Sequence, residues 1–180
     1  MEVSLSDGRV LEHMEFGEPS GRPVVLFPGT PATAGCGALV HEAASAAGVR
    51  LVAVSRPGYG ASSPSPPGLA SVARDTVELL DTLGLPQVGV HGLSGGGPFA
   101  LALGAVAPDR VSSVVVAAGP APPIGEPEDA RRSFEEEATD EFGGAGELST
   151  AEFILRRKST APRLMLPPSL LGVHSPCLRP

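Results

Sequence analysis

The stretch 88–98 constrains the fold of this chain more than any other, because a short apolar run ends there at a serine flanked by glycines. Gly92, Ser94 and Gly96 match the pattern G-x-S-x-G, in which a strand ends, the backbone turns sharply through the serine and a helix begins. Glycine is required on both sides because a Cβ would collide with neighbouring backbone. The pattern predicts that Ser94 is a nucleophile above a helix N-terminus, whose dipole favours negative charge.

The surroundings of this motif decide its meaning, because a chain with 23 glycines can match G-x-S-x-G by chance. Residues 87–91 form an apolar segment of strand length. Residues 99–107 are apolar all round, as in a helix that is buried against a sheet. Strand, turn and helix are therefore all expected, and the alternative is a glycine-rich loop with an incidental serine.

The first 120 residues predict alternating strands and helices after an opening hairpin. Helices are expected over 38–47 and from Val72 to Leu83. Strands are expected over 3–5 and 10–16, which form the hairpin, and over 23–27, 50–54 and 111–118. This order predicts the α/β class, with a doubly wound, mainly parallel sheet. Ligands bind such sheets at the carboxyl ends of the strands, where the loops 28–31 and 56–62 meet the Ser94 turn.

Composition and charge exclude several classes of function. The formal net charge of -7 argues against nucleic acid or an anionic membrane as a partner, because either requires clustered cations. No apolar run is long enough to span a bilayer, and the first ten residues lack the apolar core of a signal peptide, so a cytoplasmic location is expected. The sequence contains no metal-ligand cluster and no phosphate-binding G-x-x-x-x-G-K motif, so no cofactor is expected.

Three segments together resemble signatures of the α/β-hydrolase fold family, in the family's order and spacing. They are Gly92-Leu93-Ser94-Gly95-Gly96, Phe27-Pro28-Gly29-Thr30-Pro31 and Arg56-Pro57-Gly58-Tyr59-Gly60-Ala61-Ser62. The resemblance covers residues 3 to 120 and implies a serine hydrolase that acts on an ester, thioester, amide or similar acyl group. Two positions depart from the family's pattern: Pro28 stands where histidine is frequent, and Ser55 stands where the arginine loop usually begins with aspartate.

The resemblance implies acyl transfer, in which Ser94 Oγ attacks a carbonyl and an oxyanion develops that requires hydrogen-bond donors. Gly95 is expected to supply the first N–H. Thr30 is expected to supply the second, because the family's donor follows the loop glycine and neither Pro28 nor Pro31 has an N–H. The alternative is that Thr30 is only a turn residue. A serine at the turn argues against the dehalogenase and epoxide-hydrolase branches, which have aspartate there.

The histidines are the candidate general bases. The family places its histidine after the serine in chain order, and His174 is the only histidine that follows Ser94. No strand is expected before His174, however, which weakens its similarity to the family's histidine loop. His91 is expected to pack beneath the turn, and His13 and His41 are expected to be surface or packing residues.

The candidate acids differ in the edge of the sheet at which they are expected to lie. Asp109 lies in the turn that feeds residues 111–118 from the amino end of that strand, which is the wrong edge for a partner of Ser94. Glu126 or Glu128 follows the same strand at its carboxyl edge and is better placed.

The chain divides into three parts by its composition: an α/β-hydrolase core over 1–120, the start of a lid or another helical segment over 121–155, and an irregular tail over 156–180. Two further strand–helix units would be needed to supply the family's acid and histidine. We therefore expect a C-terminally truncated or frame-shifted family member in which the last strands are missing. Residues 111–118 would then form an exposed sheet edge, which predicts self-association.

The sequence favours a serine hydrolase with a small-molecule acyl substrate, and two alternatives stay open. One is an inactive hydrolase-fold fragment, because loss of the histidine lowers the rate of a serine triad by roughly a millionfold. The other is a binding module that uses the same cleft without chemistry.

Overall fold

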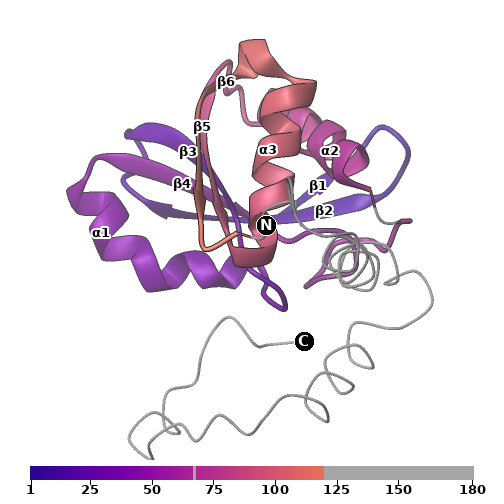
Figure 1. Cartoon of the computed structure of the whole chain (residues 1–180), viewed down its shortest axis with the longest axis horizontal. Helices are drawn as coiled ribbons and strands as arrows, with labels where there is room; N and C mark the ends of the chain where they lie inside the picture. Colours follow the sequence, from indigo (N-terminus) through magenta and orange to yellow (C-terminus); the bar gives the residue numbers. More distant parts are fainter. Residues whose placement is uncertain (67, 120–180) are drawn as a thin grey trace, which may run out of the picture.

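The computed structural model describes residues 1–66 and 68–119 (Figure 1). Its centre is a six-stranded sheet. In chain order the strands are β1 (Glu2–Ser4), β2 (Val10–Gly17), β3 (Arg22–Phe27), β4 (Val49–Val54), β5 (Val88–Leu93) and β6 (Val111–Ala117). Across the sheet they lie in the order β1-β2-β4-β3-β5-β6.

The direction of the strands matches the predicted fold class. β2 is antiparallel to both of its neighbours, β1 and β4, which accounts for the predicted opening hairpin. The pairs β3–β4, β3–β5 and β5–β6 are all parallel. The described part of the chain is therefore a mainly parallel α/β sheet, as its alternating strands and helices predict.

Helices cover both faces of this sheet. α2 (Leu69–Thr82) and α3 (Gly97–Val106) lie on one face, and α1 (His41–Ala46) lies on the other (Figure 1). The main core lies beneath α2 and α3 and includes Phe27 and Val52, whereas their chain neighbours Leu26 and Ala53 belong to a smaller cluster beneath α1. Successive residues of β3 and β4 thus enter opposite layers, because side chains alternate across a strand.

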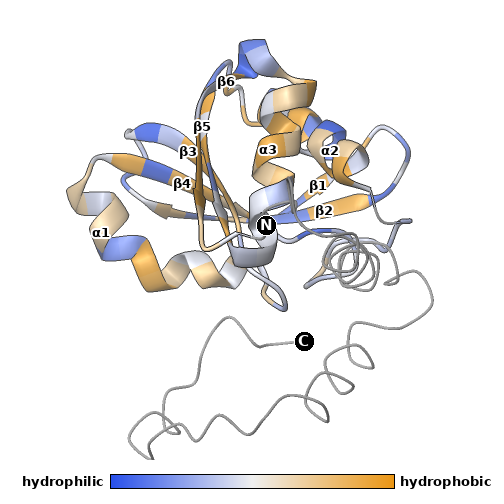
Figure 2. Ribbon diagram, viewed as in Figure 1, coloured by the Kyte–Doolittle hydropathy of each residue, from blue (hydrophilic) through white to orange (hydrophobic). Residues whose placement is uncertain are grey.

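The two helices over the main core differ in sequence pattern. α2 buries Val72, Thr76 and Leu79 on one side and is polar on the other, as Figure 2 shows. α3 is apolar on nearly every side and contacts β5, β6 and α2. These contacts account for the buried residues Phe99, Ala100 and Leu103. The outer side of α3 is apolar as well, because Leu101 and Val106 are 55% and 40% exposed in the described part of the chain.

The prediction of one helix over 38–47 is wrong at its start. Residues Ala34–Val40 form a 3-10 helix, η1, and the α-helix begins only at His41. Gly37 in η1 lies against the ring of Phe16 on β2, and a Cβ on this glycine would overlap that ring. Thr33 caps η1 by accepting a 3.3 Å hydrogen bond from the N–H of Gly35. Gly37 thus allows η1 to lie close to β2, and the local sequence does not reveal that contact.

The turn between β1 and β2 is held against α2 by charged groups. Nη1 and Nη2 of Arg9 each donate a 2.7 Å hydrogen bond to a carboxylate oxygen of Asp75, and this pairing raises the pKa of Arg9. The Asp75 side chain is only 5% exposed. One turn later on α2, Glu78 accepts hydrogen bonds from the N–H and the hydroxyl of Ser6. These contacts attach the hairpin to the helix that covers the main core.

β6 forms one edge of the sheet within residues 1–66 and 68–119. Val115 and Val116 on this strand are 57% and 39% exposed. None of the helices in the same part of the chain is both long and apolar enough to cross a membrane. The segments expected over 121–155 and 156–180 lie outside the described residues.

Candidate active site

Ser94 lies at the carboxyl end of β5, where the 3-10 helix η2 (Ser94–Gly96) leads directly into α3. Its φ of 48° is a left-handed backbone conformation, which is strained for a residue with a side chain. Ser94 is exposed, whereas Gly95 and Gly96 after it are buried. The turn therefore presents the Ser94 hydroxyl at the surface, above the N-terminus of α3.

The two glycines of the motif are required by close backbone contacts. A Cβ on Gly92 would lie 2.7 Å from the carbonyl oxygen of Gly96 and 2.7 Å from Cα of Gly97. A Cβ on Gly96 would overlap the carbonyl oxygen of Phe27, the last residue of β3. β3, β5 and α3 can meet at this point only because neither glycine has a side chain.

The loop after β3 lies directly against Ser94. A Cβ on Gly29 would lie 3.3 Å from Cβ of Ser94 and 3.9 Å from its Oγ. Among the loop and turn hydrogen bonds of residues 1–66 and 68–119, none uses the N–H of Thr30 or of Gly95. The structure thus brings together the turn and the loop that carry the expected nucleophile and the two expected oxyanion donors.

Arg56 connects this loop to its surroundings. It lies two residues after the end of β4 and is only 4% exposed. Its Nη1 donates to the carbonyl oxygen of Pro28, and its Nη2 donates to Thr30 Oγ1 at 3.0 Å and to the carbonyl oxygen of Gly29 at 3.4 Å. The sequence places Arg56 in a glycine-punctuated loop but assigns it no role. A cation two residues after a buried strand was the available signal, because buried charges need partners.

Ser55 also has a defined part in this region. Its hydroxyl accepts a 2.8 Å hydrogen bond from the N–H of Ala34 and donates one to the carboxylate of Glu12 on β2. Ser62, further along the same loop, donates to the Ser55 carbonyl at 2.7 Å and accepts from the N–H of Glu12 at 2.9 Å. Ser55 stands where the family usually has aspartate. Its hydroxyl contacts the carboxylate of Glu12, which belongs to the strand next to β4.

The described histidines are not hydrogen-bonded to Ser94. His13 is 3% exposed on β2, neither ring nitrogen has a partner among the described residues, and burial lowers its pKa. His41 accepts a 3.0 Å hydrogen bond at Nδ1 from the N–H of Gly17. His91 pairs in register with Leu26 and Val115, and its Nε2 is buried without a partner in the same part of the chain. His13 and His91 thus take packing positions, whereas His174 lies outside the described residues.

The candidate acids lie elsewhere. Asp109 is exposed in the short 3-10 helix η3 (Pro108–Arg110) before β6, at the amino end of that strand, as its sequence position predicts. Glu126 and Glu128 lie outside the described residues. Among the residues that the structure describes, no group of three or more histidine, cysteine, aspartate or glutamate side chains could hold a metal ion.

Comparison with known proteins identifies the family to which the fold belongs. A family model described as alpha/beta hydrolase fold matches residues 22–172. The uncharacterized hydrolase YcgS of Bacillus subtilis is 31% identical over 121 residues, which are 64% of this chain and 40% of that protein. This chain thus spans less than half the length of that relative.

Solved structures show the same fold. A hydrolase from Pseudomonas aeruginosa PA01 superposes with a TM-score of 0.68 at 25% identity, covering 98% of this chain and 62% of that one. The enol-lactonase from Burkholderia xenovorans LB400 superposes with a TM-score of 0.57 at 26% identity, covering 63% of this chain and 45% of that one.

Proposed function

This chain belongs to the alpha/beta hydrolase fold family, and from that premise we propose that it is a serine hydrolase that cleaves an ester or a related acyl bond of a small molecule. The observation that carries the proposal is the exposed Ser94 at φ 48°, at the end of a parallel strand and next to Gly29. A strained serine on a strand-to-helix turn is the arrangement in which a hydroxyl can approach a carbonyl from above the sheet.

In the proposed reaction Ser94 Oγ forms a bond to the acyl carbon while its proton passes to a base. The carbonyl π electrons move onto oxygen, and the tetrahedral intermediate then collapses by breaking the bond to the alcohol, which takes up that proton. Water hydrolyses the acyl-serine in the same way and restores the Ser94 hydroxyl. His174 is the only histidine after Ser94 and is our candidate for the base.

The N–H groups of Gly95 and Thr30 are the proposed oxyanion donors. No hydrogen bond from either N–H is seen among the loop and turn contacts of the described residues, which supports this role. The N-terminus of α3 adds a positive dipole end beneath Ser94. Such preorganised donors stabilise the charge of the transition state without reorganising during the reaction.

Labelling with a fluorophosphonate probe tests the proposal without requiring the natural substrate. We expect the wild-type chain and Ser45→Ala, which changes an exposed serine of α1, to be labelled and to hydrolyse p-nitrophenyl acetate. Ser94→Ala should lose both reactions, because it removes the hydroxyl that would form the acyl or phosphonyl ester. His174→Ala should slow both by several orders of magnitude.

The same experiment separates the alternatives. If neither wild type nor Ser94→Ala is labelled while both are folded, the chain is an inactive hydrolase-fold protein or a binding module. If Ser94→Ala is labelled as rapidly as wild type, Ser94 is not the nucleophile. If His174→Ala reacts at the wild-type rate, another group accepts the proton.

A further inference from the structure

We propose that Arg56 is a positioning residue that sets the direction of the Thr30 N–H and links the two sides of the oxyanion site. This inference rests on the proposed serine hydrolase function and assigns it a residue beyond the nucleophile and the two donors. The argument starts from the three acceptors of the Arg56 guanidinium, which belong to consecutive residues of one loop.

The planar peptide bond converts these contacts into an orientation. In a trans peptide the C=O and the N–H point in opposite directions. Within the described residues the cis bond is Thr30–Pro31, so the Gly29–Thr30 bond is trans. The Gly29 carbonyl faces Nη2 of Arg56 at 3.4 Å, and the Thr30 N–H of the same peptide plane therefore points away from Arg56. The Pro28 carbonyl, which accepts from Nη1, orients the Gly29 N–H in the same manner.

The hydroxyl of Thr30 strengthens this orientation. Nη2 of Arg56 donates to Thr30 Oγ1 at 3.0 Å, so the side chain and the preceding carbonyl are held by one nitrogen. A guanidinium has donors in a fixed planar fork and accepts no hydrogen bonds. Arg56 can therefore fix several acceptors of a loop at once, whereas the ammonium of a lysine lacks the second nitrogen.

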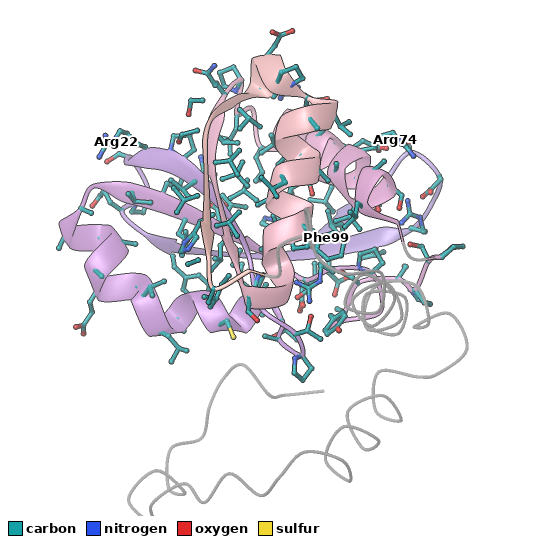
Figure 3. All side chains as sticks on the ribbon, in the orientation of Figure 1. Arg22, Arg74 and Phe99 are labelled. Atoms are coloured by element: carbon teal, nitrogen blue, oxygen red, sulfur yellow. The ribbon has the colours of Figure 1, made fainter. Side chains whose placement is uncertain are left out.

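The aromatic contacts of Arg56 connect the loop to α3, the helix that follows the Ser94 turn. The guanidinium carbon lies 5.0 Å from the ring centroid of Phe99 and 5.0 Å from that of Tyr59, distances at which cation–π attraction operates. Phe99 is in the first turn of α3, the helix that begins directly after Gly95 and Gly96 (Figure 3). Arg56 thus contacts the Thr30 loop by hydrogen bonds and the helix next to the Gly95 donor by its π contact.

This geometry predicts an effect on the transition state rather than on substrate binding. A small displacement of an oxyanion donor costs rate because the donor acts on the charge that develops at the oxygen. Arg56 is buried beneath the loop, so its replacement should leave the surface that meets the substrate largely intact. We expect the loss to fall on kcat, with KM changing little.

The test compares Arg56→Lys with Arg74→Lys, which makes the same substitution at an exposed position on α2 (Figure 3). Arg56→Lys should lower kcat for p-nitrophenyl acetate and the rate of fluorophosphonate labelling by roughly 10- to 100-fold, with KM within about threefold of wild type. Arg74→Lys should match wild type in all three quantities. Thr30→Val, which removes one acceptor and keeps the Thr30 N–H, should lower kcat by a smaller factor.

The outcomes are distinguishable. If wild type reacts and Arg56→Lys has the same kcat and labelling rate as Arg74→Lys, the role of Arg56 is overturned while the proposed function stands. If wild type does not react, the proposed function is overturned and this inference with it. If Arg56→Lys does not fold, Thr30→Val decides: a wild-type kcat in that variant overturns the inference, and a reduced kcat with unchanged KM supports it.

Discussion

Gly96 packs so closely against Phe27 that the carbonyl oxygen of Phe27 occupies the space where a Cβ on Gly96 would be. This contact joins the Ser94 turn after β5 to the end of the neighbouring strand β3, and it involves backbone on both sides. Backbone cannot rotate away as a flexible side chain can. The position of the Ser94 turn on the sheet therefore depends on the absence of a side chain at residue 96.

Gly96→Ala should consequently destabilise the protein severely, by about 2–4 kcal/mol, because the turn must separate from β3. Gly104→Ala is the matched control, since a Cβ there would lie 3.1 Å from a methyl group of Val114, which is a side chain. Chemical denaturation of both variants measures the difference. Equal stability of the two variants would show that the Ser94 turn tolerates a side chain at residue 96.

The left-handed backbone of Ser94 should lower the free energy of unfolding of the protein. A left-handed backbone costs roughly 1–2 kcal/mol for a residue with a Cβ, and glycine avoids this cost. We expect Ser94→Gly to be more stable than Ser94→Ala by about 0.5–1 kcal/mol. At Ser45 in α1 the order should reverse, because glycine is a poorer helix former than alanine. Thermal unfolding of the four variants measures both differences, and the same order at both sites would contradict strain at Ser94.

Two aspartates of α2 provide a second matched comparison. Asp75 is 5% exposed and forms two hydrogen bonds with Arg9, whereas Asp81 is 62% exposed in its ion pair with Arg110. Asp75→Asn should lower the free energy of unfolding by about 1–3 kcal/mol, because Arg9 loses a charged partner in a partly buried place. Asp81→Asn should change it by less than about 1 kcal/mol. Urea unfolding distinguishes these cases, and a similar loss in both would mean that burial does not strengthen the Arg9 contact.

Stability should depend on pH through His13. Burial lowers the pKa of His13 in the folded state, assisted by the nearby N-terminal amino group and Arg50 and opposed by the carboxylates of Glu15 and Glu12. The unfolded chain, with a pKa near 6.5, therefore binds more protons just below that pH. The free energy of unfolding should be constant above about pH 6.5 and fall as the pH decreases, by at most about 1.4 kcal/mol per pH unit.

His13→Leu should flatten this dependence between about pH 5 and 7, because the substituted side chain has no proton to bind. Arg50 lowers the pKa of Glu15 through a hydrogen bond, so the stability from that pair is lost only at lower pH, below the ordinary range of a glutamate. Unfolding measured across pH 5–8 therefore isolates the histidine. An unchanged slope in His13→Leu would assign the pH dependence to another group.

Because β6 is an edge strand among the described residues, we propose that this chain self-associates. An edge strand offers unpaired backbone groups to a second copy, and the exposed Val115 adds apolar surface. Sedimentation velocity should show concentration-dependent association of the wild type and a shift toward monomer in Val115→Lys. Leu39→Lys, which changes a residue of η1 that is 68% exposed, should associate like wild type. A wild-type chain that remains monomeric at all concentrations would contradict the proposal.

Most strands could be located from the sequence because each is a short apolar run bounded by glycine, proline or polar residues. The run 23–27 corresponds to β3 and the run 50–54 to β4, each within one residue. The start of α1 could not be located in this way. The 3-10 helix before it places Gly37 against Phe16, a contact between residues distant in the sequence that no local pattern contains.

The sequence by itself determined the fold class and the candidate residues. These are a serine between glycines, a glycine loop with Thr30, and an alternating order of strands and helices that places both at the carboxyl ends of the parallel strands. Only the tertiary structure decided which contacts hold these parts in place. Arg56 meets Thr30 and Phe99 from separate segments, and Ser55 meets Glu12 across two strands. Such contacts depend on the pairing and direction of distant strands, whereas the motif depends only on residues that are adjacent in the chain.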